Sequence, residues 1–349
     1  MTYQRDFDRK LNVALVGAGS HAYRNLLPAM HHLPVRLQAV CDVNPARSTS
    51  TAEQYGCRHY ESTADLYAKE ELDAVFLSVG PAQHPGLARE AFDAGVHVWL
   101  EKPPAMRADQ VREMIRHRKD RVAVVGVKKV FMPAARKAME ILAAPDSGPL
   151  RSLLAVYPMT IPPNGREVLE KGLFTDWLGN GIHPLSLMIA VGGPVRQVTV
   201  LRGKFDGGVC VLEFESGAIG NFHMAAGAPG SQPMEYYAFY AKKCSVVIEN
   251  CRRVVYQRGI PFQYGKTASF APEGFDHGAL VWEPQNTLAT LENKALFTQG
   301  IYGEMKHFCD CVLEGKPASQ GTLEFALEVM KVYEAALLSD GKPISVPRE

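Results

Sequence analysis

The stretch Leu11-Asn12-Val13-Ala14-Leu15-Val16-Gly17-Ala18-Gly19-Ser20-His21-Ala22 decides the fold. Most of its first residues are apolar, a pattern typical of a strand that is buried on both faces. A Gly-x-Gly-x-x-Ala turn follows and leads into apolar residues at helical spacing, Leu26, Leu27 and Met30. This order of strand, turn and helix indicates a site for a dinucleotide, whose pyrophosphate is favoured by the free N–H groups at the start of a helix.

Each small residue of the turn has a predicted role. Gly17 permits the tight bend, Gly19 lets the backbone approach a pyrophosphate, and Ala22 lets the helix pack closely on the strand. Ser20 and His21 lie between these positions, so we expect them beside the same ligand. A glycine-rich turn after a strand is often only a turn, so the interpretation needs further support.

Asp42 gives that support. It follows the apolar run 37–41 and lies 20 residues beyond Ala22, where a carboxylate can accept a hydrogen bond from a ribose 2′-hydroxyl. Its charge would repel a 2′-phosphate and therefore favours NAD, whereas Arg47 leaves NADP possible. The alternative is a helix cap or turn former before Asn44-Pro45. Together with the glycines, the cofactor interpretation is favoured.

Strands and helices alternate through the first third of the chain. Buried strands are predicted at 74–79, 96–100 and 122–127, with helical patterns between them. Strands separated by helices of this length predict a parallel, doubly wound Rossmann sheet of the α/β class. We expect this NAD(P)-binding domain to span residues 1–128.

The pattern changes after about residue 130. A helix at 133–142 is followed by short strands with tight turns, so residues 129–349 are predicted to form an α+β domain with a large, mainly antiparallel open sheet. Two closing helices, around 305–312 and 323–337, are expected to pack at the interface between the domains. Residues 262–298 show little periodicity and predict a long irregular segment that is a lid, an oligomer contact or a surface loop. The candidate strands are 150–158, 195–202, 208–215, 218–225, 234–241 and 244–249.

Composition narrows the class of protein. The chain has 38 Lys and Arg against 37 Asp and Glu, so its charge indicates neither a nucleic acid nor a membrane as partner. The first residues lack the apolar core of a signal peptide, and a cytoplasmic enzyme is expected. Cys309-Asp310-Cys311 lacks the spacing of a metal site, so we expect buried free thiols and no metal.

The carboxyl ends of the predicted strands carry the polar groups that could do chemistry. A doubly wound sheet binds its ligand at these ends. The most informative is 101–104, where Glu101-Lys102 precedes two prolines that hold the lysine in a stiff turn. Such a lysine can donate a hydrogen bond to a substrate oxygen and help to move its proton. The alternative is a solvated lysine at a strand end.

These motifs together resemble the Gfo/Idh/MocA oxidoreductases, the family of glucose-fructose oxidoreductase and inositol dehydrogenase. The resemblance rests on the glycine turn, Asp42, 81–84, 94–103 and 181–183, and it extends to 338–341. It implies a Rossmann domain that binds NAD(H) or NADP(H). It also implies a second domain whose open sheet packs in homodimers or homotetramers.

The resemblance also assigns expected roles to individual residues. Lys102 matches the catalytic lysine of the family, and His183 matches its proton acceptor or substrate ligand. His84 and Glu101 match positions near the nicotinamide and its ribose, and Pro81 opens the same motif as His84. These residues, Lys102 included, are therefore expected to contact the cofactor.

The chain departs from the family around His183. Many members carry an Asp four residues before this histidine and another three after it, where this chain has Gly179 and Ser186. Asp176 and Asn180 are the candidates to replace the missing carboxylate, and a helix N-cap is the alternative for Asp176. His183 itself has the alternative of a buried structural histidine.

Further residues are predicted to bind the substrate. Lys128 and Lys129 stand where relatives commonly have Asn and Arg, and strand alternation would point one into the cleft and the other away. Tyr157, Trp177 and Tyr236 could stack on a sugar ring, with core packing as the alternative for each.

The expected reaction is reversible hydride transfer between nicotinamide and a secondary alcohol carbon of a sugar, cyclitol or glycoside. His183 or a nearby carboxylate would take the hydroxyl proton, and Lys102 would hydrogen-bond the same oxygen. Two alternatives stay open. One is a lyase or glycosidase that retains NAD and oxidises the sugar transiently, and the other is a non-catalytic dinucleotide-binding regulatory protein.

Overall fold

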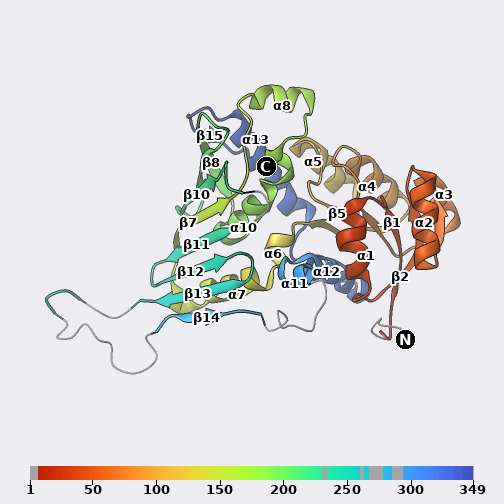
Figure 1. The fold of residues 1–349 in the computed structure, drawn as a ribbon, viewed down its shortest axis with the longest axis horizontal. Helices are drawn as coiled ribbons and strands as arrows, with labels where there is room; N and C mark the ends of the chain where they lie inside the picture. Colours follow the sequence, from red (N-terminus) through yellow and green to blue (C-terminus); the bar gives the residue numbers. More distant parts are fainter. Residues whose placement is uncertain (1–6, 230–233, 260–262, 267–277, 285–293, 349) are drawn as a thin grey trace.

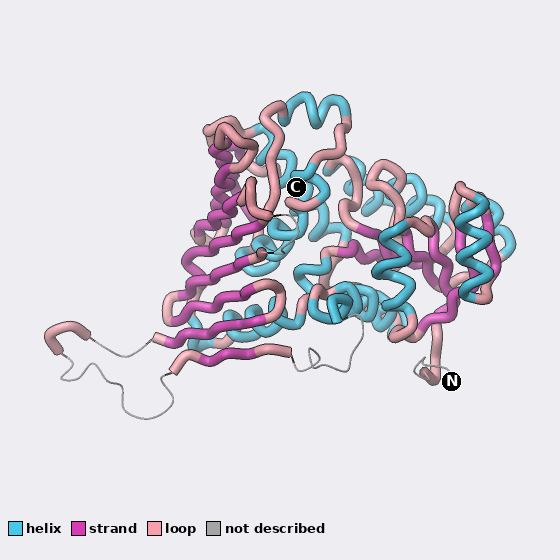
Figure 2. Tube along the Cα trace, in the orientation of Figure 1, coloured by secondary structure: helices cyan, strands magenta, loops and turns pink. Residues whose placement is uncertain are grey.

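The computed structural model describes residues 7–229, 234–259, 263–266, 278–284 and 294–348. These residues form two sheets, one of six strands and one of nine, with helices packed between them (Figure 1). The helices and strands of the smaller sheet alternate along the chain, whereas the larger sheet is built mostly from consecutive strands (Figure 2).

The six-stranded sheet is entirely parallel, which confirms the Rossmann prediction. Its strand order is β3-β2-β1-β4-β5-β6, so the order reverses between β1 and β4, at the point where such sheets bind ligands. The short strand β3 has polar side chains and gave no apolar signal in the sequence. The strands are β1 (Leu11–Val16), β2 (Val35–Cys41), β3 (Arg58–Tyr60), β4 (Ala74–Leu77), β5 (His97–Glu101) and β6 (Ala123–Gly126).

Helices connect these strands, and their ends follow the local sequence. The side chain of Asn44 accepts a hydrogen bond from the N–H of Ala46, Pro45 opens α2, and Gly56 ends it in the left-handed conformation. The segment after the glycine turn begins as a π-helical turn and buries Leu26, Leu27 and Met30. The helices are η1 (Ala22–Leu26), α1 (Leu27–Met30), α2 (Pro45–Tyr55), α3 (Thr63–Lys69), α4 (His84–Asp93) and α5 (Ala108–His117).

The nine-stranded sheet is mainly antiparallel, as predicted, with a parallel pairing between β7 and β10. Its order is β14-β13-β12-β11-β7-β10-β9-β8-β15. Strands β8 and β12 have the expected bounds, whereas β13, β14 and β15 were not predicted. The strands are β7 (Leu150–Tyr157), β8 (Val195–Arg202), β9 (Gly208–Phe214), β10 (Ile219–Met224), β11 (Tyr236–Ala241), β12 (Cys244–Glu249), β13 (Arg253–Arg258), β14 (Leu280–Trp282) and β15 (Ile344–Ser345).

The helices of this half cover the face of the larger sheet that is turned toward the smaller one (Figure 1). Helix α13 contacts both α5 and α10, and α12 contacts β5 and β6, so the two closing helices lie between the sheets. The helices are α6 (Lys128–Phe131), α7 (Pro133–Ala143), η2 (Pro145–Ser147), α8 (Gly165–Lys171), α9 (Asp176–Gly179), α10 (Ile182–Gly192), α11 (Lys294–Thr298), α12 (Ile301–Glu314) and α13 (Leu323–Leu338).

Two sequence-based expectations need correction. Within 262–298, strand β14 pairs with β13 and helix α11 forms, so these parts are not irregular; most of the rest lies outside the described residues. Lys128 and Lys129 belong to the helical turn α6, because β6 ends at Gly126. The proposed domain boundary after residue 128 therefore falls inside α6. None of the helices in the described ranges is long and apolar enough to cross a membrane.

Candidate active site

The glycine turn has the geometry that a close backbone approach requires. Gly17 has a φ of +93°, and a Cβ added there would lie 2.3 Å from the carbonyl oxygen of Ser78. Only glycine fits this position, because both its conformation and the adjoining strand exclude a side chain. A Cβ on Gly19 would meet no atom within 4 Å, so its backbone borders open space. Ala22 is buried against the sheet, as expected.

A cavity of about 830 Å³ lies at the carboxyl ends of β1, β2 and β4. Gly17, Gly19, Asp42 and Arg47 all line it, so the structure brings these four predicted residues together. This cavity fits a dinucleotide for three reasons. It lies where the strand order reverses, the backbone at Gly19 borders open space, and the carboxylate of Asp42 is buried in its wall. Ser20 is exposed next to the turn, and Pro81 precedes Ala82 and Gln83, which also line the cavity.

Asp42 joins the glycine turn to the end of β2. One carboxylate oxygen accepts a hydrogen bond from the N–H of Ala18, and the other accepts one from the N–H of Asn44, each at 2.8 Å. Asp42 therefore also stabilises the turn before Asn44-Pro45, as the alternative interpretation expected. The helix cap is Asn44 and not Asp42. Because a carboxylate oxygen can accept more than one hydrogen bond, Asp42 retains capacity for a ribose hydroxyl.

Glu101 joins the same turn to the end of β5. Its Oε1 lies 2.6 Å from Nε2 of His21, and its Oε2 accepts from the N–H of Lys102 at 3.1 Å. The side-chain amide of Asn25 lies 3.1 Å from the other ring nitrogen of His21. Since that amide nitrogen can only donate, Nδ1 of His21 accepts, and Nε2–H donates a hydrogen bond to the carboxylate of Glu101. Two predicted residues, 80 positions apart in sequence, thus form one contact.

Lys102 reaches across the cleft from the turn after β5. Its Nζ donates to the carbonyl oxygen of Gly179 at 2.9 Å, and burial lowers its pKa. The following bond to Pro103 is cis. The solvated alternative for Lys102 is therefore wrong, because the side chain is largely enclosed between the two halves of the chain.

His84 supports this turn from behind. Its Nδ1 donates to the carbonyl oxygen of Pro103 at 2.9 Å, and burial lowers its pKa to about 4. The imidazole is neutral at neutral pH. The whole residue is buried behind the turn, and its expected place beside the cofactor stays a prediction.

His183 lies near the start of α10 and is 4% exposed. Burial, and then the charges of Lys102, Lys128 and Lys129, hold its pKa well below its usual range. Its Nδ1 has no hydrogen-bond partner among the described residues. The ring of Tyr157 lies 6.4 Å from it, centroid to centroid. His183 is thus a neutral imidazole surrounded by lysines.

The carboxylate expected to replace the missing acids does not reach His183. Asp176 accepts hydrogen bonds from the N–H and hydroxyl of Thr160, at 2.7 and 3.1 Å, and from the amide of Asn180 at 2.6 Å. Ser186 donates to the backbone carbonyl of His183. The N-cap alternative for Asp176 is also wrong, because Thr175 caps α9.

Two aromatic candidates lie away from the cleft. Trp177 is fully buried, stacks on Phe222 and donates from its indole nitrogen to the carbonyl of Tyr333 at 3.2 Å, so no ring face is free for a sugar. Tyr236 pairs with Val156 on β7 and therefore lies on the opposite face of the sheet from Tyr157. Of the three aromatic candidates, Tyr157 remains beside His183.

Lys128 and Lys129 both approach the cleft, because α6 replaces the expected strand. Nζ of Lys128 donates to the side chain of Gln299 at 2.9 Å. Nζ of Lys129 is buried, donates to Glu235 at 2.5 Å and lies 5.9 Å from the ring centre of Tyr157. The expectation that one of the two lysines points away is therefore wrong.

Sequence reasoning missed Glu304 of α12 and Glu235. Glu304 is buried, and burial together with the charge of Glu101 holds its pKa well above its usual range. Its protonated form is therefore favoured over that of an exposed glutamate, while the charges of Lys128 and Lys102 act in the opposite direction. Its signal was present in the sequence, since an acid next to Met305 lies on the apolar face of a predicted helix.

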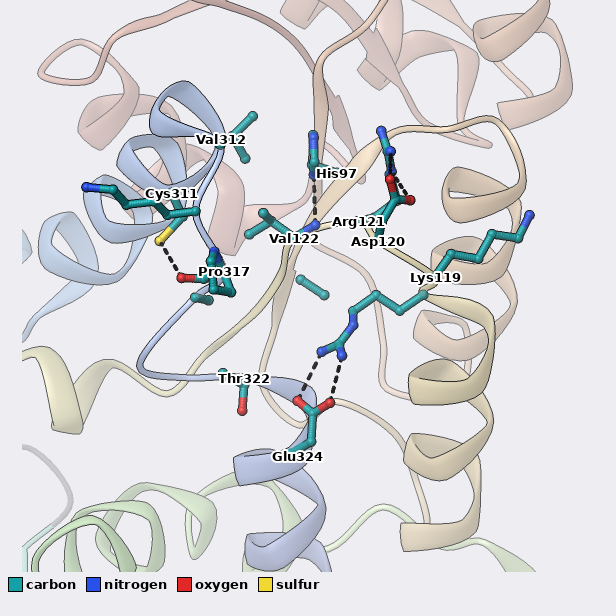
Figure 3. Close-up of a pocket in the computed structure, with 15 residues that line it drawn as sticks. His97, Lys119, Asp120, Arg121, Val122, Cys311, Val312, Pro317, Thr322 and Glu324 are labelled. Atoms are coloured by element: carbon teal, nitrogen blue, oxygen red, sulfur yellow. Dashed lines mark hydrogen bonds and ion pairs between the residues drawn. The ribbon is translucent and has the colours of Figure 1, made fainter.

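A second pocket, of about 430 Å³, lies at the amino ends of β5 and β6 (Figure 3). Four of its charged side chains form two pairs, Arg118 with Glu324 and Arg121 with Asp120. Because it lies at the end of the sheet away from the glycine turn, we do not place the active site there.

Fold and site define a protein built on a dinucleotide-binding Rossmann sheet, with a lysine turn facing a second, mainly antiparallel sheet. Residues 11–129 belong to the Gfo/Idh/MocA oxidoreductase family, because they match its model, described as "Oxidoreductase family, NAD-binding Rossmann fold".

Relatives with assigned names are distant. A dTDP-3,4-didehydro-2,6-dideoxy-alpha-D-glucose 3-reductase from Streptomyces violaceoruber is 28% identical over 58% of this chain and 63% of that protein, less than two thirds of its length. A UDP-N-acetylglucosamine 3-dehydrogenase from Acidithiobacillus ferrooxidans is 25% identical over 86% of this chain and 91% of its own. A D-xylose 1-dehydrogenase (NADP(+)) from Haloferax volcanii is 25% identical over 62% of this chain and 70% of its own.

Solved structures share the fold along nearly the whole chain. A levoglucosan dehydrogenase in complex with NADH and levoglucosan superposes with a TM-score of 0.79, 16% identity, and coverage of 97% of this chain and 100% of that one. A dehydrogenase from Chromobacterium violaceum gives a TM-score of 0.77 at 21% identity, over 93% and 94% of the two chains. At these identities the comparison shows the fold alone.

Proposed function

We propose that this chain is an NAD(P)-dependent oxidoreductase that transfers a hydride between nicotinamide and the alcohol carbon of a sugar, cyclitol or glycoside. One observation carries the proposal. Lys102 follows β5 at the same edge of the sheet as the cavity suited to a dinucleotide, its ammonium group donates to the carbonyl of Gly179, and its charge lowers the pKa of His183. The names of the relatives support sugars as the substrate class.

The cofactor is proposed to be NAD, with NADP second. Gly17, Gly19 and Asp42 would hold the nucleotide, and Glu101 would lie near its reactive end with His21. The buried charge of Asp42 supports NAD, because a 2′-phosphate would meet a carboxylate there. Arg47, exposed at the rim of the same cavity, is the feature that would tolerate NADP.

Lys102 and His183 are assigned different roles at the substrate oxygen. Bound nicotinamide dinucleotide supplies the hydride acceptor or donor. Lys102 donates a hydrogen bond to the substrate oxygen and stabilises negative charge that develops on it. His183, held neutral, accepts the hydroxyl proton during oxidation and returns it during reduction. His84 holds the turn of Lys102 in place through Pro103.

Lys102→Ala tests this assignment. We expect a fall in kcat of about 10²-fold or more, because general acid–base groups contribute on this scale, while NADH binding changes little. The measurements are NAD and NADP reduction with a panel of sugars, inositols and glycosides, and NADH titration by fluorescence. Lys137→Ala, on the exposed face of α7, is the matched control.

Near-normal turnover of Lys102→Ala would refute the role of the lysine. NADH binding without any alcohol-dependent reduction of either nucleotide would refute the oxidoreductase proposal. Turnover with stoichiometric bound cofactor and no net reduction of added nucleotide would instead indicate the transient-oxidation reaction.

We further propose a homodimer or homotetramer formed through the uncovered face of the nine-stranded sheet. Exposed apolar side chains on that face, Ile219 and Tyr240, support this arrangement.

A further inference from the structure

Two ammonium groups in the cleft have neutral partners. Lys102 donates to the backbone carbonyl of Gly179, and Lys128 donates to the side-chain amide of Gln299, each at 2.9 Å. Within the described ranges, no carboxylate oxygen lies within the 4.0 Å of an ion pair from either Nζ. Lys129 differs, because Glu235 lies 2.5 Å from its Nζ. A partly buried ammonium without a counter-ion is costly, so a ligand anion would be favoured there.

The acids nearest the cleft make their hydrogen bonds to groups other than Lys102 Nζ and Lys128 Nζ. Glu101 accepts from His21 and from the N–H of Lys102. Burial and then the charge of Glu101 hold the pKa of Glu304 well above its usual range, which disfavours its charged form. Asp176 is occupied by Thr160 and Asn180. None of these acids therefore forms an ion pair with Lys102 or Lys128, and burial followed by the charges of Lys129 and Lys102 lowers the pKa of Lys128, against the weaker opposing effect of Glu304 and Glu101.

The positive charges of Lys102, Lys128 and Lys129 have a consequence for His183. The three lysines weaken its proton affinity, and the positions where relatives carry acids are Gly179 and Ser186. An anion bound near Lys128 would offset these charges and raise the proton affinity of the imidazole. His183 would then be a better acceptor for a hydroxyl proton.

We propose that Lys128 recognises a carboxylate of the substrate, so that the alcohol that this chain oxidises belongs to a sugar acid. The inference rests on the proposed oxidoreductase function, in which Lys102 is assigned to the reacting oxygen and Lys128 is left for another group. A single ammonium matches the single charge of a carboxylate, whereas a phosphate, which Lys also binds, carries more charge. The substrate then brings the carboxylate that the chain lacks.

The test compares acids with neutral analogues. D-glucuronate, D-galacturonate and D-gluconate are paired with D-glucose, D-galactose and D-glucitol, and kcat/KM is measured for each with the preferred nucleotide. The wild type should prefer the acid in at least one pair. Lys128→Met should reduce this preference about tenfold or more, because it removes a charged hydrogen bond. Lys128→Arg retains the charge and should keep most of the preference, and Lys137→Met is the surface control.

Binding provides a readout that does not depend on turnover. With NADH present, the preferred acid should raise the melting temperature of the wild type but not that of Lys128→Met, and circular dichroism checks that both are folded. Preference for neutral sugars or for nucleotide sugars, or an acid preference unchanged in Lys128→Met, overturns the inference while the oxidoreductase proposal stands. If neither nucleotide is reduced with any substrate, the oxidoreductase proposal is overturned. The melting-temperature shift then tests by itself whether Lys128 binds a carboxylate.

Discussion

At the scale of single residues, the buried histidines have the clearest measurable consequence. His84 is neutral in the folded chain because burial lowers its pKa from 6.5 to about 4. Above pH 6.5 the imidazole is neutral in both the folded and the unfolded chain, so it does not make the free energy of unfolding depend on pH there. Below that value the unfolded chain binds the proton more readily, and stability is lost as the pH falls toward 4.

We therefore expect His84→Gln to make the free energy of unfolding less dependent on pH between 6.5 and 4. The difference between 6.5 and about 4 corresponds to about 3 kcal/mol at most, at about 1.4 kcal/mol per pKa unit. Urea unfolding at several pH values measures the slope. The same substitution at the exposed His117 is the control, and equal slopes for wild type and His84→Gln would contradict the explanation.

At the scale of elements, the turn between β1 and η1 brings the glycine turn, Asp42 and Glu101 together. Asp42 holds it to β2 through Ala18, and Glu101 holds it to β5 through His21. The turn therefore depends on three strands that are distant in sequence. A distortion at Gly17 should affect both the stability of the sheet and the cavity.

A comparison of two glycines distinguishes the cost of a positive φ from the cost of steric overlap. Gly17 and Gly56 both have positive φ, of 93° and 65°, but an added Cβ would overlap Ser78 only at Gly17 and would meet nothing within 4 Å at Gly56. We expect Gly56→Ala to cost about 1 kcal/mol and to spare NADH binding. Gly17→Ala should cost about 3 kcal/mol or more and abolish binding. Denaturant unfolding and NADH titration measure both effects, and similar losses for the two variants would argue against the overlap.

At the scale of the whole molecule, the nine-stranded sheet has one face covered by helices and one that is not covered by any described helix (Figure 1). Ile219 and Tyr240 both pair with Ser152 and so lie on the uncovered face. They are 44% and 42% exposed. They flank Ser152 of the intervening strand β7, and exposed apolar patches are typical of a surface that another protein covers.

We expect the wild type to be a dimer or tetramer in solution and the double variant Ile219→Asp, Tyr240→Asp to shift toward the monomer. Buried charges would oppose association through this face. Light scattering coupled to size exclusion measures the mass. Leu173→Asp, which places the same charge after α8, is the control. A monomeric wild type, or a double variant of unchanged mass, would contradict the proposal.

Local patterns were enough to predict the parallel sheet, the mainly antiparallel sheet and the positions of Gly17, Asp42 and Lys102. Apolar periodicity and glycine spacing depend on neighbours in sequence, so they can be interpreted without a structure. Short polar strands such as β3, and α6 in place of a strand at Lys128-Lys129, lacked such a signal. Their conformations depend on contacts with distant segments.

The sequence by itself indicated the fold class, the family resemblance and the lysine turn, because each is encoded in short motifs whose patterns depend on neighbours in sequence. Only the tertiary structure decided the charge of the cleft. Lys102, Lys128, His183 and Glu304 come from four separate segments, and their protonation depends on burial and on one another. Whether an acid compensates a lysine depends on distances in space, and these distances arise only when both sheets and their helices pack together.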